Sequence, residues 1–316
     1  MTWKQRLAAS VWHTPFILDS AVSPDQSMDD IMSTPPTAVS RTKWLVNADD
    51  FGLSVGVNHG IIQAYQQGII RSTTLMANMP AFDHAVELAK DHPGLGVGVH
   101  LNLSWGQPVS KPALVSTLVK GNGDFYSSLL VLAGRIQSGL VDINQVELEF
   151  KKQIQKVCQA GIVPTHLDTH KHIHLLPTVA RGMILAAKAF AICRIRRPVE
   201  TAAPLPIIHG CRRFMVGMGS RGLPTLLDQF NMVTPDCCAG IAARHGLTSE
   251  FLQGLLAFHH QGIMEIVSHP GYDDAESRHY SRQRLDRTAE IGILTDRRWP
   301  TLLAKRGIKL INYRDV

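Results

Sequence analysis

Histidines and an aspartate recur at regular spacing between Pro164 and His174. The ionisable residues occupy every second position of this stretch, at His166, Asp168, His170, His172 and His174. A β-strand sends alternate side chains to opposite faces, so this spacing predicts a strand with all five on one face. Clustered imidazoles and carboxylates are costly to bury unless they are paired, and a divalent metal ion is a common partner. A solvated histidine-rich turn, or a cluster that hydrogen-bonds internally, is the alternative that this stretch alone leaves open.

Other polar candidates lie on or after predicted strands elsewhere in the chain. They are Asp49 and Asp50 after 43–48, His100 and Asn102 in 96–103, Arg196 and Arg197 in 192–198, and His269 near the end of 262–271. Where parallel strands alternate with helices in a barrel, functional residues gather at the carboxyl ends of the strands. We therefore expect these side chains to converge. The plainer alternative, that strand ends are simply more exposed to water, accounts poorly for two acids and, with His170, three imidazoles.

One carboxylate and two imidazoles from different strands make a three-ligand metal site with open positions for water and substrate. An open site of this kind is typical of a catalytic ion rather than a structural one. A second carboxylate beside the ion can take a proton from water, and an imidazole across the site can protonate a leaving group. The residue types therefore predict metal-dependent hydrolysis.

The elements that position these residues alternate between strand and helix about eight times. Alternation of this kind implies parallel strands joined by right-handed crossovers. The length favours a TIM-like (β/α) barrel with seven to eight parallel strands, and an open doubly wound sheet is the second possibility. This domain is predicted to span 41–316. Residues 1–40 lack periodicity and are rich in Ser, Thr, Pro and Asp near their end, which predicts a partly mobile N-terminal extension.

The composition excludes several classes of protein. The chain is 45% hydrophobic and 18% charged, as is typical of soluble globular proteins. No apolar run reaches the ~20 residues of a membrane span, and the N-terminus is a poor secretion signal. The five cysteines form no CxxC pair, which fits a reducing, cytoplasmic location. The net charge of +6 comes from scattered basic residues, so we expect no nucleic-acid partner and at most peripheral membrane contact.

Four separated motifs then allow a more specific interpretation. They are Val46–Leu53, Gly98–Leu101, Thr165–His174 and Ser268–Gly271. Together they resemble the YdjC/ChbG family of carbohydrate deacetylases, in order, from about residue 43 to the C-terminus. The region 199–245 is more similar to HpnK, the hopanoid-associated branch. The resemblance implies a TIM-like barrel, often a homodimer, that removes acetyl groups from N-acetylated sugars with a divalent ion recorded as magnesium.

The resemblance also assigns roles to individual positions. Asp49 matches the family's proton acceptor and His269 its acid, whereas Asp50, His100 and His170 match its metal ligands. Arg197 is matched to a basic residue after the fifth strand. Apart from the resemblance, Asp168 is expected either to orient an imidazole from behind or to make a plain strand-end hydrogen bond. His172 is expected on the substrate side or in a loop, and Asn102 near the substrate or behind the ligands. An Asp/His/His set suits zinc or iron(II) at least as well as magnesium, which prefers oxygen ligands.

The substrate is the least defined part of this interpretation. It is expected to be an oligosaccharide or a glycolipid that contains N-acetylglucosamine. The apolar segment Arg212–Leu227 has basic flanks and predicts either a lid over a lipid tail or a core helix. Another single-metal hydrolase, such as a phosphoesterase, and a non-catalytic sugar-binding protein are the competing hypotheses.

Overall fold

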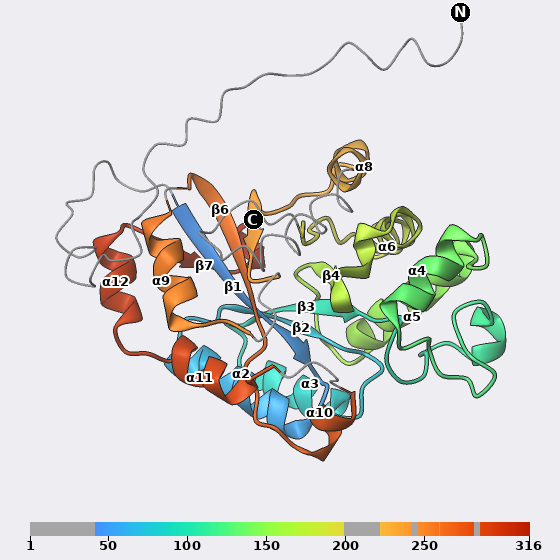
Figure 1. The fold of residues 1–316 in the computed structure, drawn as a ribbon, viewed down its shortest axis with the longest axis horizontal. Helices are drawn as coiled ribbons and strands as arrows, with labels where there is room; N and C mark the ends of the chain where they lie inside the picture. Colours follow the sequence, from blue (N-terminus) through green and yellow to red (C-terminus); the bar gives the residue numbers. More distant parts are fainter. Residues whose placement is uncertain (1–41, 199–221, 242–245, 259, 281–284) are drawn as a thin grey trace, which may run out of the picture. The chain divides into compact units, whose positions relative to one another are not determined.

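The computed structural model describes residues 42–198, 222–241, 246–258, 260–280 and 285–316 (Figure 1). The predicted extension 1–40 lies outside the described residues. So does most of the predicted lid or core segment, of which only the end, in the helix α8 (Leu223–Gln229), is described.

The described strands form one parallel sheet that curls into a half-barrel (Figure 1). Its order is β4-β3-β2-β1-β6-β5, and β7 also pairs with β1. Isolated parallel bridges, Leu167 to Ile195 and Arg194 to Val233, continue the pairing beyond β4. The predicted α/β architecture with parallel strands is therefore confirmed, and a closed barrel stays a prediction. The strands are β1 (Thr42–Phe51), β2 (Ser72–Leu75), β3 (Gly96–Leu101), β4 (Leu167–Thr169), β5 (Cys237–Ala239), β6 (Gly262–Ser268) and β7 (Lys309–Ile311).

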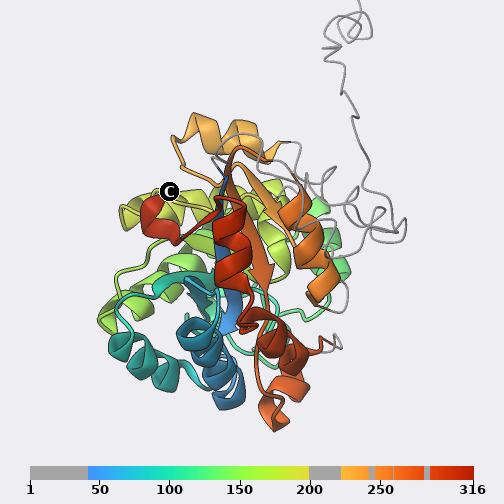
Figure 2. The same cartoon turned by 90° about the vertical axis from the view of Figure 1, so that its left-hand side faces the viewer.

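Helices surround the outer face of this curled sheet (Figures 1 and 2). α2 contacts β1 and packs beside α11, whereas α5 contacts β3 and packs along α6. No helix in the described ranges is both long and apolar enough to span a membrane. The α-helices other than α8 are α2 (Val55–Gln67), α3 (Phe82–Asp91), α4 (Leu129–Gln137), α5 (Ile143–Gln159), α6 (Pro177–Ala189), α9 (Ser249–Ala257), α10 (Ala275–Tyr280), α11 (Arg287–Leu294) and α12 (Trp299–Lys305). The short 3₁₀ turns are η2 (Pro112–Val115), η3 (His170–Leu175) and η4 (Tyr313–Asp315).

The central strand β1 gives the site a rigid support. Trp44, Leu45 and Val46 are fully buried in a nearly continuous apolar run, as expected for a parallel strand covered on both faces. α2 then starts directly after the strand, because the hydroxyl of Ser54 accepts a hydrogen bond of 3.2 Å from the N–H of Val57. This N-cap ties the end of β1 to the helix that covers it.

The histidine-rich stretch differs from its prediction. Only Leu167–Thr169 forms a strand, and His170–Leu175 forms a 3₁₀ turn. Lys171 and His172 have φ angles of 56° and 53°, in the left-handed region, so the extended backbone cannot continue through them. The expectation that five alternating side chains share one strand face is therefore wrong. Side chains alternate between two faces only within the strand Leu167–Thr169.

Candidate active site

A bulge at the end of β1 directs two adjacent aspartates toward one site. The pairing of β1 with β2 shifts register between Ala48 and Phe51. Within this bulge Asp50 has φ 71°, a left-handed conformation that aspartate tolerates better than most residues. Bulges of this kind commonly re-aim side chains beside active sites. Both Asp49 and Asp50 here contact groups from distant parts of the chain, Arg196 and Arg287 among them.

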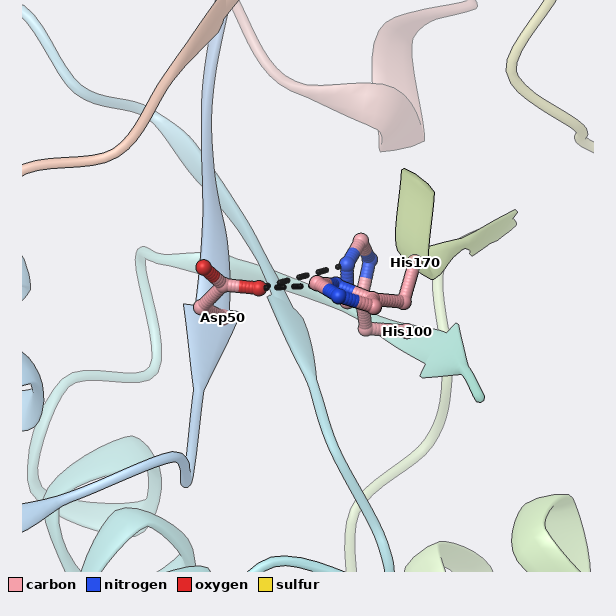
Figure 3. Close-up of side chains that lie close together, drawn as sticks. All are labelled: Asp50, His100 and His170. Carbon is pink, nitrogen blue, oxygen red and sulfur yellow. Dashed lines mark ion pairs between the residues drawn. The ribbon is translucent and has the colours of Figure 1, made fainter. Parts of the chain in front are cut away.

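Asp50, His100 and His170 form a buried cluster at the carboxyl ends of β1, β3 and β4 (Figure 3). Oδ1 of Asp50 lies 3.5 Å from Nε2 of His100 and 3.3 Å from Nδ1 of His170. One ligand atom from each residue lies within 4.8 Å of the others. Within the described part of the chain, neither Oδ1 of Asp50 nor Nε2 of His170 has a hydrogen-bond partner. A buried carboxylate oxygen that has no hydrogen bond and faces two imidazole nitrogens fits a divalent cation.

The protonation states of His170 and Asp50 suit a cation. Burial lowers the pKa of His170 to about 4, against the opposing effect of Asp50. The imidazole of His170 is therefore neutral near pH 7, which is the form that binds a metal. Burial alone would raise the pKa of Asp50, but Arg287 and the two histidines hold it well below its usual range. Nη2 of Arg287 lies 2.6 Å from Oδ2 of Asp50, so this oxygen is occupied while Oδ1 faces the imidazoles.

Asp168 fixes the orientation of His100. Nδ1 of His100 donates to Oδ1 of Asp168 at 2.7 Å, and Thr74 Oγ1 donates to Oδ2 of Asp168 at 3.2 Å. The ring therefore presents Nε2 to Asp50, in the carboxylate–imidazole arrangement common behind metal ligands. Burial opposes protonation of His100, but the carboxylates of Asp168, Asp49 and Asp50 outweigh it and raise its pKa to about 10. The surrounding carboxylates therefore favour a positive charge here, and His100 must lose its proton if it is to bind a metal ion.

Asp49 is held by a buried arginine, Arg196. Nη2 and Nη1 of Arg196 donate to Oδ1 and Oδ2 of Asp49 at 2.7 and 2.8 Å. Arg196 is fully buried and also contacts Asp168 at 2.6 Å and Glu265 at 2.9 Å. Burial would raise the pKa of Asp49, but Arg196 and His100 keep it well below its usual range. Asp49 therefore stays ionised and fixed in orientation.

His269 lies across from this carboxylate, directly after β6. Its Nε2 is 3.9 Å from Oδ2 of Asp49, and its side chain is 21% exposed, far more than those of the cluster. Its backbone N–H donates to Oε2 of Glu290 at 2.7 Å, and Nη1 of Arg287 donates to its carbonyl at 3.3 Å. The backbone of His269 is thus held in place, and its imidazole is accessible to a ligand that enters from solvent.

The remaining sequence candidates have other surroundings and contacts. Asn102 is fully buried and its side chain bonds to Asn78, Ser104 and Trp105, so it holds a loop. His172 lies half-buried in η3, with a buried Nδ1 that has no hydrogen-bond partner within the described ranges. Arg197 is half-buried beside Arg196, which is the arginine that contacts Asp49.

Sequence reasoning missed three charged residues of the site. Arg287 and Glu290 come from α11, and Glu265 from the middle of β6. Of these three residues, only Glu265 could have been recognised from the sequence. It is a charged residue in the otherwise apolar strand Gly262–Ser268, and such a charge must have a partner. Glu265 has two such partners, Arg196 and the hydroxyl of Tyr313 at 2.7 Å. Nothing in the sequence around Arg287 pointed to a contact with Asp50.

Comparisons with known proteins identify the family of this chain. The family described as YdjC-like protein matches residues 43–305. A carbohydrate deacetylase of Geobacillus stearothermophilus is 37% identical over 278 residues, which cover 86% of this chain and 96% of the relative. A carbohydrate deacetylase of Listeria monocytogenes (strain HCC23) is 33% identical over 276 residues, covering 87% of this chain and 100% of the relative.

A solved structure is similar over the same length. It is a candidate cellobiose-phosphate cleavage protein from Enterococcus faecalis V583, with a TM-score of 0.71 and 26% identity. The match covers 87% of this chain and 98% of that protein. The resemblance drawn from four separated motifs is thereby confirmed, and the chain belongs to the YdjC-like family, together with curated relatives named carbohydrate deacetylases.

Proposed function

We propose that this protein is a metal-dependent hydrolase that removes the acetyl group from an N-acetylated sugar. The observation that carries the proposal is the convergence of Asp50, His100 and His170 beside the ionised Asp49. The family supports it, because the curated relatives are named carbohydrate deacetylases. Closure of the barrel, a homodimer and a cytoplasmic location stay predictions.

The reaction breaks the amide C–N bond and forms a C–O bond to water, releasing acetate and a free amine. A divalent cation held by Asp50, His100 and His170 would supply Lewis acidity to the amide carbonyl and to water. Asp49 accepts the proton of the attacking water, and Arg196 keeps its carboxylate ionised and aimed for this step. His269, 3.9 Å from Asp49 and partly exposed, gives a proton to the departing amine.

The types of the three ligand atoms indicate which metal ion the site prefers. One carboxylate oxygen with two imidazole nitrogens suits zinc or iron(II) at least as well as magnesium. Elemental analysis of protein purified without added metal distinguishes them. One equivalent of zinc in the purified protein would rule out magnesium as its metal ion.

The direct test is acetate release from N,N′-diacetylchitobiose and from a lipid-linked N-acetylglucosamine. We expect release that a chelator abolishes and a divalent metal restores. The Asp49→Asn variant should lose at least about 100-fold in kcat, on the scale of general base catalysis, while it still binds the metal. Unchanged turnover in Asp49→Asn would refute its role as base. Turnover of phosphate esters in place of acetylated sugars would favour a phosphoesterase, and sugar binding without acetate release would favour a binding protein.

A further inference from the structure

Tyr313 in η4 has no exposure to solvent. Its ring stacks on that of His166, with centroids 3.5 Å and planes 10° apart. Its backbone N–H donates to Oγ of Ser72 at 3.3 Å, and η4 follows β7, which pairs with the central strand β1. The side chain of Tyr313 is therefore held in place through both its backbone and its ring.

The hydroxyl of Tyr313 donates to a carboxylate that in turn faces Arg196. Its oxygen lies 2.7 Å from Oε2 of Glu265, and Oε1 of Glu265 accepts from Nε of Arg196 at 2.9 Å. Burial and the charge of Glu265 hold the pKa of Tyr313 well above its usual range, so the hydroxyl stays protonated and donates. A buried tyrosine needs a partner for its hydroxyl, and a backbone carbonyl would be sufficient. Here the partner is instead a charged residue that contacts the arginine of the site.

The guanidinium of Arg196 is held from more than one side. Nη1 and Nη2 donate to the two carboxylate oxygens of Asp49, and Nη1 also lies 2.6 Å from Oδ2 of Asp168. Nε, the remaining nitrogen, donates to Glu265. Because the guanidinium is planar and rigid, the position of Nε restricts the plane in which the other two nitrogens lie. A shift of Glu265 would therefore turn the pair of N–H groups that orients the proposed base.

We propose that Tyr313 is a positioning residue for the hydrolysis and acts on Asp49 through Glu265 and Arg196. This inference rests on the proposed function, in which Asp49 accepts the proton of the attacking water. The hydroxyl of Tyr313 holds one oxygen of Glu265, whose other oxygen holds the guanidinium that aims Asp49. The rate of hydrolysis then depends on a hydrogen bond that does not touch the base itself. A tyrosine that only fills the core would add stability without changing kcat of the folded protein.

Tyr313→Phe tests the proposal, because it removes the hydroxyl and keeps the ring that stacks on His166. We expect kcat for acetate release from N,N′-diacetylchitobiose to fall about tenfold while KM stays at the wild-type value. This loss is smaller than the roughly 100-fold cost of a misplacement of about 1 Å at a reacting group. Tyr65→Phe, at a half-buried position on α2, is the matched control and should keep the wild-type kcat. Denaturant unfolding shows that each variant is folded in the assay. An unchanged kcat in Tyr313→Phe, or a loss confined to KM, would overturn the inference.

A double variant tests whether Tyr313 acts through Glu265. Glu265→Gln should lower kcat on a similar scale, because an amide has one oxygen and cannot accept from both Tyr313 and Arg196 on separate oxygens. Adding Tyr313→Phe to Glu265→Gln should then cost less than about twofold more, since residues in one hydrogen-bond network are not additive. A further tenfold loss in the double variant would show that the two residues act independently and would overturn the inference.

The orientation of Arg196 can also be observed without turnover. Proton–nitrogen NMR spectra of the metal-free protein report its Nε–H group, whose resonance is assigned by its loss in Arg196→Lys. This resonance should shift in Tyr313→Phe and keep its position in Tyr65→Phe. An unmoved resonance in Tyr313→Phe would overturn the inference even if the wild-type protein releases acetate. Absence of acetate release from wild type with every acetylated sugar would instead overturn the proposed function.

Discussion

Arg196 binds both carboxylate oxygens of Asp49, at 2.7 and 2.8 Å, from a position with no exposure to solvent. The same guanidinium lies 2.6 Å from Oδ2 of Asp168, whose other oxygen accepts from His100. One cation therefore orients both the proposed base and the residue behind a proposed metal ligand. A change at Arg196 should disturb two functions of the site together.

Arg196→Lys should reduce kcat by about 100-fold, the scale of a misplacement of about 1 Å at a reacting group. Lysine keeps the charge but lacks the planar fork that binds two carboxylate oxygens at once. Steady-state acetate release checks this, with thermal unfolding to show that the variant is folded. Arg197→Lys changes the neighbouring side chain in the same way and should cost much less. Equal losses in the two variants would contradict the role given to Arg196.

Asp168→Asn should weaken metal binding by about 10–100-fold, as is typical for residues that orient a ligand. An amide in place of the carboxylate cannot accept from His100, Thr74 and Arg196 together, so the His100 ring loses its fixed orientation. Calorimetric titration with zinc measures the affinity. Asp142→Asn, at the exposed N-cap of α5, is the control. Wild-type affinity in Asp168→Asn would show that His100 is oriented by other contacts.

The convergence of the main candidates was accessible from sequence for a simple reason. Parallel strands share one direction, so residues at their carboxyl ends reach the same edge of the sheet. Asp50, His100 and His170 each stand at or just after such an end, and their residue types were sufficient to suggest a cation. The strand ends therefore predicted that these side chains converge, whereas the family resemblance selected Asp50, His100 and His170 as the ligands.

Other parts of the site depend on packing that no local pattern encodes. Arg287 reaches Asp50 only because α11 packs beside α2, and the two residues are 237 positions apart. The left-handed turn at Lys171 and His172 could not be anticipated, since neither residue type favours that conformation as glycine does. Whether Arg196 or Arg197 contacts Asp49 depends on the register of this segment. A shift of one residue exchanges the two faces of an extended chain.

Gly98→Ala should lower the free energy of unfolding by roughly 1–3 kcal/mol, the usual cost of overpacking a core. A Cβ at Gly98 would lie 2.5 Å from two ring atoms of His166. That ring cannot move away easily, because it stacks on Tyr313 with centroids 3.5 Å apart and planes 10° apart. Denaturant unfolding measures the change. Gly121→Ala is the control, since a Cβ there meets no atom within 4 Å. Equal stability of Gly98→Ala and wild type would mean that the His166 ring has room to shift.

Glu265→Gln should change how stability depends on pH. Burial raises the pKa of Glu265 to about 7, and the like charges of Asp168 and Asp49 add to this against the opposing effect of Arg196. In the unfolded chain a glutamate titrates near ~4.3. Between these values the folded protein holds a proton that the unfolded chain has lost. Wild-type stability from this group is therefore fully present below pH ~4.3 and is lost as the pH rises through about 7.

Glutamine does not titrate, so the variant lacks this loss. The unfolding free energy of Glu265→Gln minus that of wild type should rise between pH 5 and 7.5, by on the order of 1–3 kcal/mol. Denaturant titrations at the two pH values, with the same metal content in both proteins, isolate this difference from groups that titrate in both. Glu250→Gln, at an exposed position in the first turn of α9, should give the same difference at both pH values. If the difference in unfolding free energy between Glu265→Gln and wild type does not vary with pH, Glu265 keeps one protonation state. Arg196 would then face the same number of buried carboxylates at both pH values.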